Sequence, residues 1–141
     1  MKARMLLSVM LFAAALPVAG SAQDGTPSLQ RGPAVDYLTD GAGNSVYIYL
    51  RDGGQGLSSC YDVCATNWPP VLVDGEPVVG EGLVSSFVST VERTDGTTQL
   101  AYDGWPLYYY ARDAAPGQAN GHTLGDTFYL VTSSGARVPF G

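Results

Sequence analysis

The chain of 141 residues has little of the chemistry on which most functional motifs depend. It contains two cysteines, one histidine and seven lysine or arginine residues. All three methionines and the only lysine lie near the start, at or before Met10. No segment has the spacing of a catalytic nucleophile motif, a metalloprotease helix or a phosphate-binding loop. The sequence therefore does not indicate a particular reaction.

Basic residues are scarce. Beyond residue 22, five arginines stand against thirteen aspartate and glutamate residues, a net charge near −8 when the histidine is neutral. A surface of this sign repels phosphate backbones and anionic lipid headgroups. We therefore expect no nucleic acid partner, and instead an unknown small molecule or an envelope protein.

The N-terminal segment has the pattern of a secretory signal peptide. Two basic residues precede an apolar run over 5–16 that is too short to span a membrane, and small residues precede a cut between Ala22 and Gln23. The first cysteine is Cys60, so no lipid-modified cysteine follows the cut. This pattern predicts a periplasmic or secreted protein without a membrane anchor.

The rest of the chain reads as one mainly β domain. Residues 23–34 are polar and aperiodic, which predicts a flexible lead. Eighteen glycines, many tyrosines and few helix-forming runs favour strands joined by turns over 35–141. We expect two repeats, about 35–80 and 91–141, as pseudo-symmetric modules of hairpins and meanders.

One stretch is written twice. Residues 45–52 and 106–113 align without a gap at a spacing of sixty-one residues, and glycines flank both copies. Each copy alternates as a strand does. One face carries mainly aliphatic residues: Val46, Ile48, Leu50, Leu107, Tyr109 and Ala111. The other carries Tyr-x-Tyr-x-Arg: Tyr47, Tyr49, Arg51, Tyr108, Tyr110 and Arg112. The spacing also aligns Trp68 with Tyr129.

The elements around these strands follow from turns and caps. A turn at 40–44 predicts a hairpin into the first repeated strand, and turns in 92–105 predict a three-stranded meander ending in the second. A serine cap and the prolines after Trp68 predict one short helix around 58–68. The valines of 71–73 and 77–79 predict another short hairpin.

Three motifs together resemble a known bacterial family. They are the doubled Tyr-x-x-x-x-Asp, the segment Cys-x-x-x-Cys-Ala-x-x-Trp-Pro-Pro over 60–70, and Tyr-x-Gly-x-Pro-Leu-Tyr-Tyr over 102–109. The family comprises secreted tandem-repeat proteins of unknown function, often predicted lipoproteins. The resemblance covers about residues 35–132. It implies a secreted repeat protein and no particular activity.

The aromatic rows are the first candidate binding site, comprising Tyr47, Tyr49, Tyr108 and Tyr110 with Trp105 nearby. In one interpretation both strand faces are buried and the modules pack through these rings. In the other, the rings form an exposed platform for a sugar, quinone or peptide.

Charged residues of the motif form a second candidate set. Asp52 and Asp113 precede glycine-rich turns, where a carboxylate commonly accepts backbone N–H bonds. If the fold brings them together, they could instead act in acid–base chemistry or hold a hard cation. Arg51 and Arg112 could lie on a tyrosine ring or pair with an aspartate.

Cys60 and Cys64 are the third candidate. An oxidising compartment favours a disulfide. Because the loop between the two cysteines is short, the bridge would stabilise the fold by only about 2 kcal/mol. Two thiolates could alternatively bind copper with His122, or form a redox pair. The spacing is similar to that of periplasmic copper chaperones for cytochrome oxidase, although Ala65 replaces their proline. His122 on its own is typical of a solvated loop residue.

These observations favour a non-enzymatic periplasmic binding or interaction protein with an unidentified ligand. The alternative is a copper-handling or thiol-redox protein that uses Cys60 and Cys64. An enzyme built on Asp52 and Asp113 is a third hypothesis, for which the sequence suggests no substrate.

Overall fold

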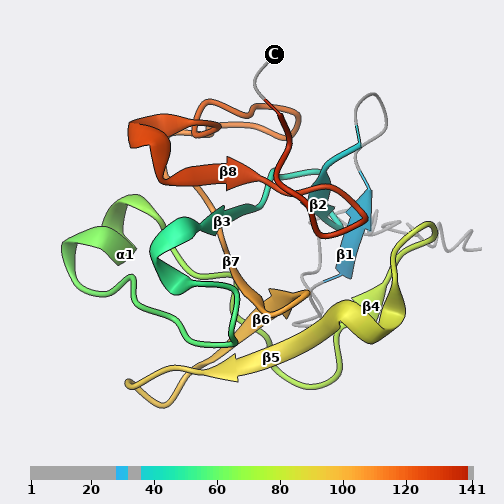
Figure 1. The fold of residues 1–141 in the computed structure, drawn as a ribbon, viewed down its shortest axis with the longest axis horizontal. Coiled ribbons are helices and arrows are strands. Elements are labelled where there is room, and N and C mark those ends of the chain that lie inside the picture. Colours follow the sequence, from blue (N-terminus) through green and yellow to red (C-terminus); the bar gives the residue numbers. More distant parts are fainter. Residues whose placement is uncertain (1–27, 32–35, 140–141) are drawn as a thin grey trace, which may run out of the picture.

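The computed structural model describes residues 28–31 and 36–139. The predicted signal peptide, 1–22, and its cleavage before Gln23 lie outside the described residues. The described chain is mainly β, with two sheets and short helices (Figure 1).

The larger sheet has five antiparallel strands in the order β5-β6-β7-β3-β8. In chain order they are β3 (Tyr47–Tyr49), β5 (Val88–Glu92), β6 (Thr98–Tyr102), β7 (Trp105–Tyr108) and β8 (Phe128–Leu130). The smaller sheet has the order β2-β1-β4. Its strands are β1 (Ser28–Arg31), β2 (Leu38–Asp40) and β4 (Val78–Val79).

The two copies of the repeated stretch lie side by side at the centre of the larger sheet. Strand β3 pairs with β7 in antiparallel register, and Tyr47 lies opposite Tyr108, its own counterpart in the repeat. A residue that faces its repeat equivalent in this way marks a local pseudo-two-fold axis. The predicted pseudo-symmetric modules are therefore confirmed.

The repeats are also intertwined, because a segment of each pairs with the other. Strand β8 of the second repeat pairs with β3 of the first. In the reverse direction, the segment after the helix reaches the second repeat through bridges of Pro70 to Tyr108 and Leu72 to Gln99. Each repeat thus contributes backbone hydrogen bonds to the other.

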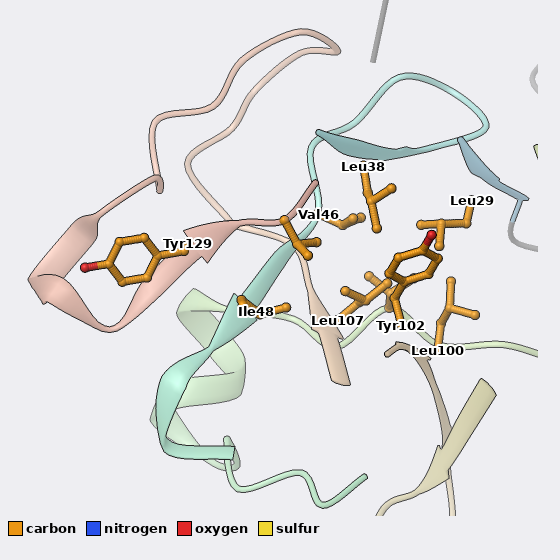
Figure 2. Packing of buried hydrophobic residues seen from close by; sticks show 10 residues of the cluster. Leu29, Leu38, Val46, Ile48, Leu100, Tyr102, Leu107 and Tyr129 are labelled. Atoms are coloured by element: carbon orange, nitrogen blue, oxygen red, sulfur yellow. The ribbon is translucent and has the colours of Figure 1, made fainter. Parts of the chain in front are cut away.

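The central strands are buried on both faces. One face joins an aliphatic cluster drawn from both sheets (Figure 2), which includes Leu29, Leu38, Val46, Ile48, Leu100 and Leu107. The opposite face joins an aromatic cluster that includes Tyr47, Trp68, Tyr108, Tyr110 and Phe128. The two-period alternation of the repeated stretches thus divides the core into two chemically different halves.

The repeated strands and the helix are shorter than predicted. Strand β3 stops at Tyr49, and Leu50–Asp52 form a 3-10 turn, η1. Helix α1 covers only Val63–Asn67 rather than 58–68. Ser58 does not cap it, because its hydroxyl hydrogen bonds with Tyr108 and Arg93 instead.

The other sequence predictions concern one turn, a meander, a hairpin and the N-terminal lead. The turn at 40–44 and the meander β5-β6-β7 are confirmed. The hairpin predicted over 71–79 is wrong, because 71–73 bond with the second repeat and β4 pairs with β1. Within the predicted flexible lead, Ser28–Arg31 form β1, which pairs with β2 as β5 pairs with β6. The buried side chain of Leu29 helps to hold β1 in place.

The remaining short elements are two 3-10 turns, η2 (Ser85–Phe87) and η3 (Leu124–Asp126). In the described part of the chain, no helix has the length and apolar character needed to cross a membrane.

Candidate functional site

The doubled Tyr-x-x-x-x-Asp motif works across the repeats rather than within one. The phenol of Tyr47 donates to Oδ2 of Asp113 at 2.6 Å, and the phenol of Tyr108 donates to Oδ2 of Asp52 at 2.7 Å. Each tyrosine thus uses the aspartate of the other copy. The antiparallel pairing of β3 with β7 produces this exchange.

The other carboxylate oxygen of each aspartate is held in an equivalent way. Oδ1 of Asp52 accepts from the backbone N–H and hydroxyl of Ser59 at 2.8 and 2.6 Å. Oδ1 of Asp113 accepts from the backbone N–H and side-chain amide of Asn120 at 2.9 and 3.0 Å. Ser59 and Asn120 are again sixty-one residues apart. Each aspartate thus accepts a backbone N–H from the loop that follows it, the kind of contact that the turn-fixing interpretation expects.

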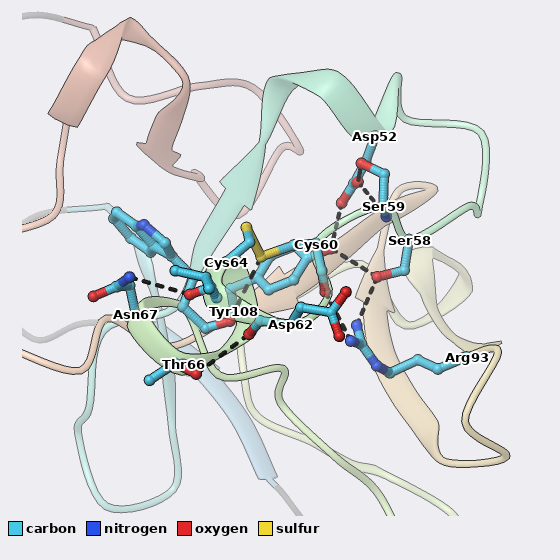
Figure 3. The surroundings of a disulfide bond; sticks show 12 residues. Asp52, Ser58, Ser59, Cys60, Asp62, Cys64, Thr66, Asn67, Arg93 and Tyr108 are labelled. Carbon is cyan, nitrogen blue, oxygen red and sulfur yellow. Dashed lines mark hydrogen bonds between the residues drawn. A yellow bond between two sulfur atoms is a disulfide. The ribbon is translucent and has the colours of Figure 1, made fainter.

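Asp52 is the more buried of the two aspartates, and Figure 3 shows its surroundings. It is 6 % exposed, and its burial raises the pKa of the carboxyl group, although bonds from Ser59 and Tyr108 oppose that shift. Buried Arg93 lies on the same side and donates to Ser58, to Gln99 and to the backbone carbonyl of Cys60. These contacts make a polar network under the first motif.

The aromatic rows are mostly interior. Tyr47 and Tyr108 have no exposed surface, Tyr110 is 9 % exposed and Tyr49 is half-buried. This burial matches the interpretation in which both strand faces are covered, and it removes Tyr47 and Tyr108 from any exposed platform. Trp105 does not join these rings but packs against the aliphatic cluster. Its indole leaves room only for glycine at Gly54, where a Cβ would come within 2.6 Å of the ring.

Four rings form a continuous stacked column through the aromatic cluster. The neighbouring centroid distances are 4.4 Å from Tyr49 to Phe128, 3.6 Å from Phe128 to Trp68 and 4.4 Å from Trp68 to Tyr110. Tyr47 meets Trp68 edge-on at 5.4 Å, as Tyr108 meets Phe128 at 6.1 Å. Each such ring contact adds about 0.5–1.5 kcal/mol to stability beyond the effect of burying the rings.

The column corrects the predicted alignment of Trp68 with Tyr129. The backbone N–H of Leu50 donates to Thr127, and that of Ala111 donates to Asn67. The repeat spacing therefore falls to sixty residues at this point, and Phe128 is the counterpart of Trp68. The two middle rings of the column, Trp68 and Phe128, therefore stack across the pseudo-two-fold axis.

Neither motif arginine is buried with the paired tyrosines and aspartates. Arg51 and Arg112 are both exposed. The guanidinium groups found over tyrosine rings are those of Arg93 on Tyr61 and Arg137 on Tyr129.

Cys60 and Cys64 form a disulfide, with their Cα atoms 5.2 Å apart. The bridge joins the segment before α1 to the helix itself (Figure 3). While it is closed, neither sulfur offers a thiolate to copper, so the copper hypothesis requires reduction first and stays a prediction. His122 accepts the backbone N–H of Leu130 at its Nδ1, at 3.1 Å, and its Nε2 is buried with no hydrogen-bond partner among the described residues. Within the described ranges, no group of three or more His, Cys, Asp or Glu side chains is placed to hold a metal ion.

An open pocket of about 260 Å³ lies where the repeats meet beside the second motif. The first repeat contributes Asp40, Asn44 and Ser45. The second contributes Tyr109, Tyr110 and Asp113. Asp40 accepts from the phenol of Tyr109 at 2.9 Å, and burial raises the pKa of that phenol. A second pocket of about 280 Å³, between the 73–77 turn and β5, contains no motif residue and no aromatic ring.

Sequence reasoning missed several members of the site. Asp40 and Tyr109 were assigned only to a turn and to the aliphatic face, and Ser59, Arg93 and Asn120 carried no signal of their own. Ser59 and Asn120 share the repeat spacing, so extending the alignment past each motif could have found both.

Residues 36–72 and 89–131 match a protein family described as a secreted repeat of unknown function. The two matched segments cover more than half of the chain and fall largely within the predicted repeats. No curated protein and no solved structure matches the chain. By its two repeats, the chain belongs to this family of secreted repeats of unknown function.

Proposed function

We propose that this protein is a non-enzymatic binding protein whose ligand is a small molecule with an amino or other cationic group. The observation that carries the proposal is the pocket at the repeat junction, which combines two carboxylates with two tyrosine side chains. Small-ligand sites typically have this form, a concave surface with aromatic walls and a few placed polar groups.

The charge of the pocket favours a cation. Every hydrogen bond found for Asp113 in the described chain comes from a neutral donor, namely Tyr47 or Asn120. The hydrogen bonds found for the Asp40 carboxylate in the same part of the chain likewise come from neutral donors, on Ala42, Asn44 and Tyr109. Two negative charges thus border one opening without a counter-charge in these contacts. An aromatic wall adds attraction, because a cation is favoured near the face of a ring.

The same geometry favours binding over catalysis. Of the described residues that line the pocket, none is a histidine or a cysteine. Ser45 is the lining hydroxyl that could act as a nucleophile, and it donates to the backbone carbonyl of Gln118 at 2.6 Å. A serine nucleophile needs an adjacent general base, which this arrangement does not supply.

A thermal-shift and calorimetric comparison tests the proposal. Small mono- and diamines are compared with neutral sugars of similar size, at low and at high salt. We expect saturable amine binding that weakens with salt and that Asp40→Asn reduces about tenfold, the equivalent of about 1.4 kcal/mol.

The matched control is Asp95→Asn. Asp95 fixes an exposed turn through Thr97, much as Asp40 fixes its turn through Asn44, but it lies outside the pocket. Equal binding of neutral sugars, no binding of any amine, or an equal loss in Asp95→Asn would overturn the proposal.

We further propose that the protein acts in the periplasm after cleavage of a signal peptide at Ala22. The family description as secreted supports export, and the basic and then apolar start supports the cut. The intact mass of protein recovered from the periplasm tests this. A chain beginning at Gln23 is expected, and an uncleaved chain would contradict it.

A further inference from the structure

The aromatic cluster contains both stacked rings and phenols that are hydrogen-bonded to a carboxylate. Tyr49, Phe128, Trp68 and Tyr110 form the column, and Tyr49 at one end is half-buried. A half-buried ring gives reactants in solution access to the cluster. The column therefore links the surface to fully buried rings by direct ring contacts.

Two buried phenols adjoin this column. Tyr108 meets Tyr49 edge-on at 6.3 Å, and Tyr47 meets Tyr110 edge-on at 6.5 Å. A phenol that loses one electron becomes strongly acidic, so its proton must pass to a base at the same time. A base assists such a transfer when it lies within hydrogen-bond reach, about 2.6–3.2 Å. The carboxylates of Asp52 and Asp113 lie at 2.7 and 2.6 Å from these phenols.

The composition leaves tyrosine and tryptophan as the side chains most open to oxidation. Sulfur side chains are the usual targets of oxidants in proteins. Here the three methionines lie at or before Met10, and both cysteines are already joined as a disulfide. The described chain therefore contains no thioether and no free thiol. Oxidising equivalents that reach it meet tyrosine and tryptophan first.

We propose that Tyr47 and Tyr108 are redox-active tyrosines that give one electron each to a one-electron oxidant, an oxidised metal complex or an oxygen-centred radical. The electron leaves through the stacked column. The phenol proton moves along the existing hydrogen bond, from Tyr108 to Asp52 or from Tyr47 to Asp113. The products are a neutral phenoxyl radical, a protonated aspartate and the oxidant reduced by one electron. No ligand in the pocket is required.

The buried setting of Asp52 supports the assignment. Burial raises the pKa of this carboxyl group, so a transferred proton is held more readily there than on an exposed aspartate. The phenoxyl radical is neutral, and the phenol of Tyr108 has no exposed surface on which it could react with solvent.

Photochemical oxidation with ruthenium tris-bipyridine and persulfate, followed by rapid freezing and electron paramagnetic resonance, tests the proposal on the full chain. We expect a neutral tyrosyl radical whose yield falls several-fold in the double variant Tyr47→Phe, Tyr108→Phe. The control is Tyr61→Phe, because the Tyr61 phenol accepts from the backbone of Thr94 and no carboxylate partner is found for it in the described chain. An unchanged yield in the double variant, or an equal loss in the control, would overturn the proposal.

A second measurement needs no variant. High-field resonance of the oxidised wild-type protein in light and heavy water reports a hydrogen bond to the radical oxygen. A hydrogen-bonded radical with an exchangeable deuteron coupling is expected from the Tyr–Asp pairs. A spectrum of freely rotating, non-bonded surface tyrosyl radicals would contradict the proposal even if the double variant failed to fold.

Discussion

The surroundings of the two motif aspartates differ, although the bonds that hold them are equivalent. Asp52 is buried beside Arg93, and the disulfide lies in the segment that follows it. Asp113 is half-buried and lines the open pocket with Asp40. The pseudo-symmetric framework is thus closed at the first motif and open at the second. The open side is where the ligand of the proposed function would reach the framework.

A similar contrast holds in the segments that follow the two motifs. The first repeat carries Cys60 where the second carries Gly121, sixty-one residues later. Gly121 lies against the indole of Trp68, where a Cβ would come within 2.6 Å of the ring. A side chain on the second side would therefore displace the central stack. Equivalent positions have diverged according to what each side leaves room for.

The largest expected effect comes from the ring pair on the pseudo-two-fold axis. Trp68→Ala and Phe128→Ala each remove a buried ring from the middle of the column, and each should cost about 3–5 kcal/mol in the free energy of unfolding. Urea unfolding measures both. If removing either ring lowered the free energy of unfolding no more than a substitution at the surface does, the column would not be the shared core of the two repeats.

The next effect separates the closed side from the open side. Asp52→Ala leaves the phenol of Tyr108 and the N–H of Ser59 without their acceptor in a buried site, which should cost about 1–3 kcal/mol. Asp113→Ala should cost less, because its site is partly open and water can replace the carboxylate. The two variants are compared by chemical denaturation under identical conditions. Equal losses in the free energy of unfolding would contradict the contrast between a closed first motif and an open second one.

The disulfide should contribute a smaller amount that belongs to the first repeat alone. Replacing both cysteines by serine should lower the free energy of unfolding by about 2 kcal/mol, because the loop that the bridge closes is short. Reducing agent should destabilise the wild-type protein to the same extent and leave the serine variant unchanged. A much larger loss would mean that α1 depends on the bridge for its fold.

The smallest expected effect concerns the buried phenols, whose contribution to stability changes only at alkaline pH. Burial is the main cause that raises the pKa of Tyr47 and Tyr108, whereas tyrosines of the unfolded chain ionise near pH 10. A raised folded-state pKa gives stability that is fully present below about pH 10 and is lost as the pH rises above it. Ultraviolet titration should therefore show these phenols ionising together with unfolding. Their reversible ionisation in the folded protein would contradict the burial.

The sequence predicted the parts of this structure that depend on local periodicity. Alternation of apolar and aromatic residues in 45–52 and 106–113 identified the central strands, and the turn at 40–44 identified the first hairpin. The helix was predicted too long because Ser58 has the chemistry of a cap, while its hydroxyl bonds with residues far along the chain.

The candidate site was harder to predict because its contacts are long-range. Nothing in the spacing of Tyr47 and Asp52 shows that each bonds with the other repeat, since that exchange follows from the antiparallel register of β3 and β7. The pocket joins Asp40 to Tyr109, sixty-nine residues apart. The disulfide was favoured because the signal-peptide pattern predicts an oxidising compartment and the two cysteines are close in sequence.

Double-mutant cycles on the motif test the central claim, that each tyrosine is completed by the aspartate of the other repeat. Tyr→Phe and Asp→Asn variants are combined across the repeats, as Tyr47 with Asp113 and Tyr108 with Asp52. They are also combined within one repeat, as Tyr47 with Asp52 and Tyr108 with Asp113. The account predicts coupling energies of about 0.5–3 kcal/mol for the pairs across the repeats and values near zero for the pairs within one repeat. Strong coupling within each repeat and none across would contradict it.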